Sequence, residues 1–201
     1  MAQLLFFDQG HKYTLDGEEV PSVSQLCRFL SREVYGTVAQ YTLDRAADRG
    51  TRVHKACEAL DVYGQVNVTE DIAPYVTAYL KFRQEHEVAW NMVERSLAHP
   101  KERYAGTIDR YGTLDGGKAL VDLKSTYTVH KRLATAQLNL YRWMVEAEGH
   151  AVDKLYILHL KKDGYKLVEI EKRDDVPTAL LTLHRLMEKK RRNKKQNVCS
   201  D

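Results

Sequence analysis

The sequence predicts an α/β protein in which an α/β core follows a helical front. Segments with helical apolar spacing and a capping signal dominate before residue 87, whereas strand-like segments with turn signals dominate between about 88 and 124. Of the 201 residues, 43% are hydrophobic and 29% are charged, which is typical of a globular protein with a core of its own. We therefore expect residues 1–201 to form a single domain.

The helical front is preceded by a short β-hairpin over residues 4–8 and 13–15, with Asp16-Gly17 as turn residues. Ser22 and Gln25 have the spacing of a capping box, so a helix is expected from there to about residue 30. The apolar spacing then predicts further helices, with a break near Gly50, over residues 38–48, 50–61 and about 72–86.

The core is expected to contain two groups of strands separated by a long helix. The first group has three strands and the second is a hairpin across Lys162-Asp163-Gly164. A last helix runs from about Val176 into the C-terminal tail. The expected strands lie at about 88–98, 104–114, 118–124, 153–160 and 165–170, and the long helix at 132–148.

The Asp115-Gly116 turn sets the register of the most informative pair of strands. Asp-Gly between two β-prone segments is a strong hairpin signal, and a two-residue turn makes paired residue numbers sum to 231. Asp109 then lies opposite Asp122, with their Cβ atoms roughly 4.5–5.5 Å apart. Strand alternation puts Lys124 on the same face as Asp122.

Two facing carboxylates are best tolerated when a cation lies between them, because like charges directly opposite each other destabilise a sheet. Mg²⁺ favours a few carboxylates together with water and phosphate oxygens. Asp109 and Asp122 are therefore candidate metal ligands, and Lys124 is a candidate catalytic cation. The alternative is an ordinary hairpin whose charged side chains face solvent.

Four motifs in order resemble the PD-(D/E)XK nuclease superfamily, most closely its RecB-type and phage-encoded exonucleases. The segments 11–17 and 21–24 are also similar to the front end of phage members, so the resemblance spans about residues 4–170. The motifs are Arg49-Gly50-Thr51-Arg52-Val53-His54, Gly106-Thr107-Ile108-Asp109, Asp122-Leu123-Lys124 and Gln137-Leu138-Asn139-Leu140-Tyr141.

The resemblance implies a restriction-endonuclease-like core, a mixed central sheet flanked by helices, behind a helical N-terminal region. It implies catalysis by Asp109, Asp122 and Lys124, with a water activated by one or two Mg²⁺ or Mn²⁺ ions. A histidine ligand favours Mn²⁺. The implied metal ligands are the side chains of His54, Asp109, Asp122 and Glu94 and the backbone carbonyl of Leu123.

Several supporting residues are expected around this site. Gln137 and Tyr141 lie four apart on one helix stripe, where the resemblance implies support of the site and contact with the substrate strand. Glu58 is one turn after His54, while Ser125 and Thr126 follow the catalytic strand and are candidate phosphate donors. Alternatives remain open: a packed core histidine, an edge-strand Glu94, core packing of Gln137 and Tyr141, an exposed Glu58, and a simple turn cap at residues 125–126.

The net charge of +3 is unevenly distributed. Residues 185–195 carry seven basic residues against the single acid Glu188, so this segment is +6 and the remainder is −3. We expect the basic tail, 185–201, to bind DNA phosphates through a set that includes Lys189, Lys190, Arg191 and Arg192. The alternative is a solvated helix end.

The three cysteines, Cys27, Cys57 and Cys199, are too few and too widely spaced for a disulfide framework, a Cys-based zinc site or an iron–sulphur cluster. The sequence shows no signal peptide and no apolar run of membrane-spanning length, so a cytoplasmic protein without membrane contact is expected. The resemblance implies a DNA exonuclease of phage or recombination type, with a helicase, a recombinase or a single-strand-binding protein as candidate partners. The alternatives are a structure-selective endonuclease and a non-catalytic nucleic-acid-binding or recruitment module.

Overall fold

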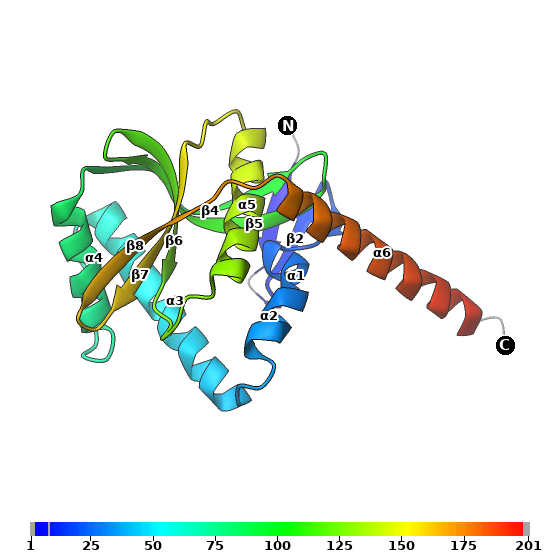
Figure 1. The fold of residues 1–201 in the computed structure, drawn as a ribbon, viewed down its shortest axis with the longest axis horizontal. Coiled ribbons are helices and arrows are strands. Elements are labelled where there is room, and N and C mark those ends of the chain that lie inside the picture. Colours follow the sequence, from blue (N-terminus) through cyan, green and yellow to red (C-terminus); the bar gives the residue numbers. More distant parts are fainter. Residues whose placement is uncertain (1–2, 8, 199–201) are drawn as a thin grey trace.

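The computed structural model describes residues 3–7 and 9–198, with side chains described as far as Lys190. It contains a central sheet of five strands in the order β4-β5-β6-β7-β8 and a separate N-terminal sheet in the order β1-β2-β3 (Figure 1). The central strands are β4 (Val88–His99), β5 (Tyr104–Leu114), β6 (Gly117–Lys124), β7 (Lys154–Lys161) and β8 (Gly164–Ile170).

The central sheet is mixed, as predicted. Strands β6 and β7 pair in parallel, whereas the other neighbours are antiparallel. A parallel pair needs a crossover connection, and helix α5 (Lys131–Ala147) provides it. The fold class expected from the sequence, a mixed sheet flanked by helices, is therefore confirmed.

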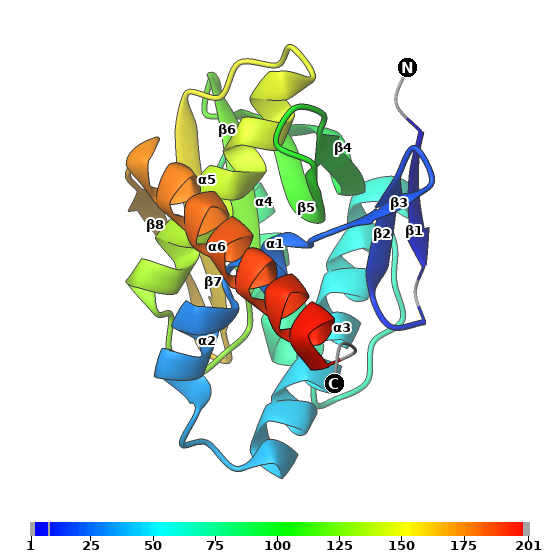
Figure 2. The same ribbon diagram turned by 90° about the vertical axis from the view of Figure 1, so that its right-hand side faces the viewer.

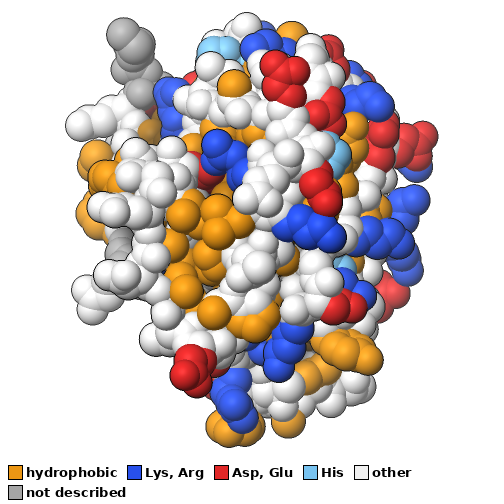
Figure 3. Space-filling model, turned by 90° about the vertical axis from the view of Figure 1, so that its left-hand side faces the viewer, with side chains coloured by type: hydrophobic (Ala, Val, Ile, Leu, Met, Phe, Trp, Pro, Cys, Tyr) orange, Lys and Arg blue, Asp and Glu red, His pale blue; other side chains and the backbone are white. Residues whose placement is uncertain are grey.

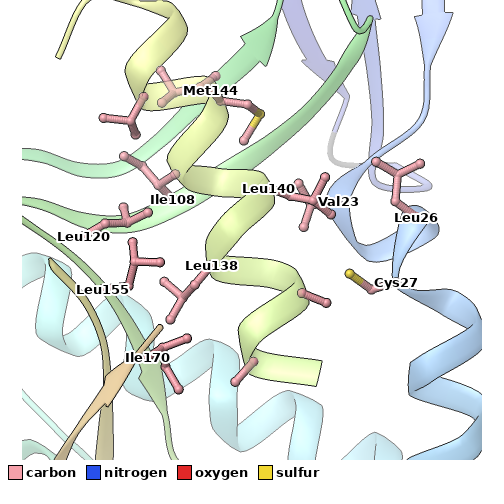
Figure 4. Packing of buried hydrophobic residues seen from close by; sticks show 14 of the residues in the cluster. Val23, Leu26, Cys27, Ile108, Leu120, Leu138, Leu140, Met144, Leu155 and Ile170 are labelled. Carbon is pink, nitrogen blue, oxygen red and sulfur yellow. The ribbon is translucent and has the colours of Figure 1, made fainter. Parts of the chain in front are cut away.

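Helices cover both faces of this sheet. On one face, α5 packs between the sheet and the N-terminal helices, with Leu138, Leu140 and Met144 among its fully buried side chains (Figure 4). The other face is covered by α3 (Gln40–Tyr63) and α4 (Ala73–Glu85). Val121 and Leu123 of β6 pack on the α3–α4 face, so Asp122 and Lys124 lie on the α5 face by strand alternation.

The Asp115-Gly116 turn has positive φ at both residues, 49° and 82°, as a two-residue type I′ turn requires. The paired residues of β5 and β6 run from Leu114 with Gly117 to Arg110 with Val121, the predicted register. Asp115 is also tied to the start of β4, because the Glu87 N–H donates to its carboxylate at 2.9 Å. The turn is thus fixed at both its backbone and its side chain.

The N-terminal region differs from the prediction in its details. Its sheet has three strands, β1 (Leu4–Phe7), β2 (Lys12–Leu15) and β3 (Glu18–Val20), and Asp16-Gly17 joins β2 to β3. The prediction missed β3 because a segment of three residues gives no readable alternation. Figure 2 shows this small sheet as a separate sheet beside β4 and β5, and its buried residues Tyr13, Leu15 and Val20 cluster with Ala105 of β5.

The helices of the front also differ from the prediction. The Ser22–Gln25 capping box is present, but α1 (Val23–Leu26) ends early and α2 (Arg28–Tyr35) follows it. The predicted break at Gly50 was wrong, because α3 runs through it as one helix of 24 residues. A glycine inside a helix costs only about 1 kcal/mol relative to alanine, and packing of this helix against the sheet offsets that cost.

Helix α6 (Asp175–Val198) begins against α5 and extends far beyond the body of the protein (Figures 1 and 2). The face seen in Figure 3 mixes acidic, basic and apolar side chains, without a field of one charge. Within the described residues, no helix is both long and apolar enough to cross a membrane.

Candidate metal centre

Three potential metal ligands converge where α3 meets strands β4 and β5. His54, Glu94 and Asp109 each offer one ligand atom, and these atoms lie within 4.8 Å of one another. His54 Nδ1 is 3.3 Å from Glu94 Oε1 and 3.5 Å from Asp109 Oδ1. The three side chains are 25%, 20% and 10% exposed, so the group is half-buried but still reachable from solvent.

The carbonyl of Leu123 also belongs to this group, because it lies 3.0 Å from His54 Nε2. Asp109 connects to the same residue from the other side, since its Oδ2 accepts a hydrogen bond of 2.6 Å from the Leu123 N–H. This side-chain bond lies directly beyond the last backbone pair of β5 and β6. Leu123 therefore links the histidine and the aspartate through its backbone.

Glu94 has an unusual backbone conformation. Its φ is 44°, in the left-handed region that costs a side-chain-bearing residue about 1–2 kcal/mol. The β4–β5 pairing has an irregularity between Trp90 and Met92, a short distance before it. Such strain is held in place by surrounding contacts and often lies at functional sites, and here it accompanies contacts of the Glu94 carboxylate with His54 and Arg110.

Arg110 is a fully buried cation that sequence analysis did not identify. Its Nε donates to Asp61 at 2.7 Å, and its Nη1 donates to Glu94 at 3.0 Å and to the Asp109 carbonyl at 2.7 Å. Asp61 also accepts from the Tyr79 hydroxyl at 2.6 Å. The guanidinium therefore holds Glu94 in place and compensates the buried Asp61 carboxylate as well as the half-buried Glu94 carboxylate.

A sequence signal for this network existed. Asp61 is seven residues after His54, two helical turns away on the same face of α3. Arg110 directly follows the predicted ligand Asp109 in an otherwise apolar strand. A buried strand position with a charged residue calls for an opposite charge, which the acidic residue on the His54 face supplies.

Asp122 and Lys124 form a separate ion pair. Asp122 is 5% exposed, and Lys124 Nζ lies 3.0 Å from its Oδ1 and 2.7 Å from its Oδ2. Burial raises the pKa of the Asp122 carboxyl, while Lys124 acts in the opposite direction. Burial alone would lower the pKa of Lys124, but the Asp122 and Asp109 carboxylates raise it above its usual value. Lys124 is thus a cation at neutral pH.

The predicted ligand set is thus divided in two. The structure brings together His54, Glu94, Asp109 and the Leu123 carbonyl, whereas the Asp122 carboxylate faces Lys124. The buried Asp122 Oδ2 makes no hydrogen bond of good geometry.

A divalent cation fits the His54 group on the chemistry of its donors. Burial acts to lower the pKa of His54, but the Asp109 and Glu94 carboxylates outweigh it and raise the pKa to about 9. At neutral pH a proton therefore supplies the positive charge between two carboxylates. A divalent cation would take the place of that proton, with carboxylate oxygens and an imidazole nitrogen as ligands.

Tyr141 packs against the glycine of the Gly106–Asp109 motif. A Cβ atom on Gly106 would lie 2.9 Å from Tyr141 Cε1 and 3.0 Å from Val23 Cγ2, so only glycine fits there. Burial, with the Asp122 and Asp109 carboxylates, raises the pKa of the Tyr141 hydroxyl well above its usual value. Gln137 is half-buried one turn earlier on α5.

The remaining predicted residues lie around this centre. Ser125 is buried and its carbonyl accepts from Arg49 at 3.2 Å. The Thr126 hydroxyl donates to the Thr128 carbonyl at 3.0 Å and so caps the turn. Glu58 is half-buried and outside the His54 group.

The tail and the cysteines are described only in part. Lys189 and Lys190 are exposed on α6, whereas the side chains of Arg191 and Arg192 lie outside the described residues. Cys27 and Cys57 are buried in the two different core clusters, and Cys199 lies outside the described residues.

A cavity of about 370 Å³ opens beside the ligand group. Glu94, Asp109 and Tyr141 line one part of it, and Phe6 and His11 of the N-terminal region line another. The carboxylates therefore open into a space bounded by both sheets.

No family model matches this chain, and no curated protein matches it. Solved structures with a similar fold include an alkaline exonuclease and a second protein, SSO0001. The alkaline exonuclease LHK-Exo from Laribacter hongkongensis has a TM-score of 0.46 and 12% identity, over 89% of this chain and 93% of its own. The protein SSO0001 has a TM-score of 0.43 and 15% identity, over 83% of this chain and 74% of its own.

Proposed function

We propose that this chain is a single-domain, divalent-metal-dependent DNA nuclease of the PD-(D/E)XK type, and an exonuclease of phage or recombination origin. The observation that supports this best is the meeting of His54, Glu94 and Asp109 beside the Asp122–Lys124 pair. All but Glu94 belong to the ordered motifs, and the five residues come from three strands and one helix. A structural role alone does not call for three ligand atoms this close together.

The side chains of His54, Glu94 and Asp109 and the carbonyl of Leu123 would hold the cation, with Asp122 completing the site when a second ion or the substrate is present. Mn²⁺ or Mg²⁺ bound there would polarise the scissile phosphate and lower the pKa of an attacking water. The imidazole ligand favours Mn²⁺.

Lys124 would act as a cation in this reaction. Because the Asp122 and Asp109 carboxylates raise its pKa, we expect it to act as an ammonium ion rather than as a general base. Its ammonium can donate to the phosphate oxygens, where negative charge develops as the phosphodiester bond breaks. Asp122 holds the ammonium in place through the ion pair.

A cleavage assay tests this proposal and separates it from its alternatives. The pure protein is incubated with linear, circular and single-stranded DNA in Mg²⁺, Mn²⁺ or EDTA. An exonuclease degrades linear DNA from its ends, spares circles and is silent in EDTA. Cleavage of circles would indicate an endonuclease, and binding without cleavage in either metal would indicate a non-catalytic module. An end label shows which end is lost first.

The basic tail is proposed to add affinity for DNA phosphates. Lys189 and Lys190 are exposed on a helix that extends from the body, where a strand of DNA could lie against them. Truncation after Glu188 should weaken binding across sequences and flatten the dependence of affinity on salt concentration. An unchanged salt slope would mean that the tail is only a solvated helix end.

A further inference from the structure

An aromatic cluster lines the cavity beside the ligand group. The centroid of the Phe6 ring lies 4.8 Å from that of Tyr13 and 5.1 Å from that of His11, and the His11 and Tyr13 centroids are 5.6 Å apart. Tyr13 is only 1% exposed, whereas Phe6 is 39% exposed. The cluster is therefore buried at its base and presents Phe6 to solvent.

This cluster is fixed relative to the metal ligands. The Tyr13 hydroxyl lies 2.9 Å from Thr107 Oγ1 of β5, and Thr107 Oγ1 lies 2.9 Å from Ser96 Oγ of β4. The contact therefore reaches both of the strands that carry Glu94 and Asp109. Thr107 is two residues before Asp109 on β5. The backbone adds a second link, because the Ala105 N–H donates to the Pro21 carbonyl at 3.0 Å.

The same cavity is lined by aromatic side chains and by carboxylates. Phe6, His11 and Tyr13 line it together with Glu94 and Asp109, and its volume of about 370 Å³ lies in the range typical of small-ligand sites. One part is aromatic, and the other consists of carboxylates that repel a phosphate unless a cation lies between them. A nucleotide has the matching chemistry, since it joins a flat base to a phosphate.

We propose that Phe6 is the stacking surface for one unpaired base of a single-stranded DNA end, while the adjacent phosphate lies at the metal centre. This inference rests on the proposed nuclease function and gives it a substrate class. Each base offers a π face to an aromatic ring, so such stacking tolerates any sequence. A base inside a duplex is already stacked on both faces, so we infer an unpaired nucleotide at this site.

Strand β1 provides a matched control for Phe6. Phe7 is the next residue, has the same side chain and is 49% exposed. Phe6 pairs with Tyr13 and Phe7 with Lys12, so alternation places the two phenylalanines on opposite faces of the sheet. Phe7 does not line the cavity.

The experiment uses single-stranded oligonucleotides with 2-aminopurine at successive positions from either end, in Ca²⁺ to prevent turnover. Wild type should quench the fluorescence at one position near one end. Phe6→Ala should lose that quench and about 5- to 150-fold in affinity, the value of one stacked base. The Phe6→Tyr and Phe7→Ala variants should keep both the fluorescence quench and the affinity of the wild type. An abasic site at that position should weaken binding to wild type but not to Phe6→Ala.

Three results would overturn the inference: no position-specific quench with wild type, equal losses in Phe6→Ala and Phe7→Ala, or an abasic penalty that persists in Phe6→Ala. Cleavage of linear DNA by the wild type in Mn²⁺ is measured separately. An active wild type whose Phe6→Ala variant binds normally would reject only the stacking site. A wild type that stacks a base but never cleaves would reject only the nuclease proposal.

Discussion

The two sides of the candidate metal centre neutralise their acids in different ways. On the side formed by α3, β4 and β5, Glu94 and Asp109 share His54, and all three side chains keep some exposure. On the β6 side, Asp122 is buried and has its own lysine within 2.7 Å. On the first side Asp109 and Glu94 depend on the proton of His54 in addition to Arg110, whereas on the second side the acid has a lysine of its own.

The comparison suggests a division of labour. The pKa of about 9 makes the His54 proton the replaceable positive charge on the first side, so that side is the one prepared to exchange it for a metal ion. The Asp122–Lys124 pair requires no added charge and offers a fixed ammonium instead. The first side is suited to binding a cation and the second to stabilising charge on a substrate.

Removing the ammonium from the β6 side should give the largest effect. Lys124→Met keeps the side-chain length but leaves Asp122 buried without a counter-ion, so the free energy of unfolding should fall by about 3–5 kcal/mol. Nuclease rate should fall on the order of 10²–10³-fold, the cost of losing one charge-stabilising group. Urea unfolding and single-turnover cleavage of linear DNA measure the two effects.

The double variant Asp122→Asn/Lys124→Met is the control for that pair. With both charges gone, most of the lost stability should return, because the uncompensated buried charge has been removed. Activity should stay low. Wild-type rates in Lys124→Met and in Asp122→Asn at saturating Mn²⁺ would mean that the active site lies elsewhere.

The Arg110→Met variant removes the buried guanidinium that holds Glu94 on the side formed by α3, β4 and β5. It leaves the Asp61 and Glu94 carboxylates without their shared guanidinium, so we expect a loss of about 3–5 kcal/mol of stability and weaker Mn²⁺ binding by calorimetry. Arg83→Met removes the second cation on Asp61, one whose side chain is 35% exposed, and should cost about 1 kcal/mol or less. Equal losses in the two variants would remove the special role of Arg110.

The pH dependence tests the exchange of proton and metal. The pKa of His54 is raised to about 9 in the folded protein, so its proton stabilises the metal-free fold. That contribution is complete below a pH of roughly 6.5, the ordinary histidine pKa, and is lost as pH rises through about 9. In EDTA, wild type should therefore lose stability across this window, measured by urea unfolding, whereas His54→Gln should change less.

In the presence of Mn²⁺ the trend should reverse, because a higher pH removes the competing proton. Calorimetry should show tighter Mn²⁺ binding with rising pH, binding of Mn²⁺ stronger than Mg²⁺, and weaker binding in His54→Ala. Identical metal binding by wild type and His54→Ala would exclude His54 as a ligand.

The smallest effect concerns the backbone strain at Glu94. Glu94→Gly and Glu94→Ala both delete the carboxylate, but only glycine adopts a φ of 44° without cost. We expect the glycine variant to be more stable by about 1 kcal/mol, measured by thermal unfolding. In an ordinary strand alanine is favoured over glycine, so the opposite order would show that Glu94 is not strained.

The sequence predicts most of the sheet because its signals are local. Asp115-Gly116 determines its own turn, and the turn determines which residues of β5 and β6 face each other. The position of Arg110 depends instead on Asp61, 49 residues away, and no local pattern reports such a pair. The φ of Glu94 is likewise imposed by tertiary contacts, and the continuity of α3 through Gly50 by packing outside the helix.

The two-residue turn at Asp115-Gly116 also limits how this protein can change in length. One residue inserted there would shift the pairing by one, and every side chain of β6 would change face. Asp122 and Lys124 would then exchange places with Val121 and Leu123, which now pack against α3 and α4. Natural relatives should therefore differ freely in the number of residues between α3 and α4, but hardly at all at this small turn.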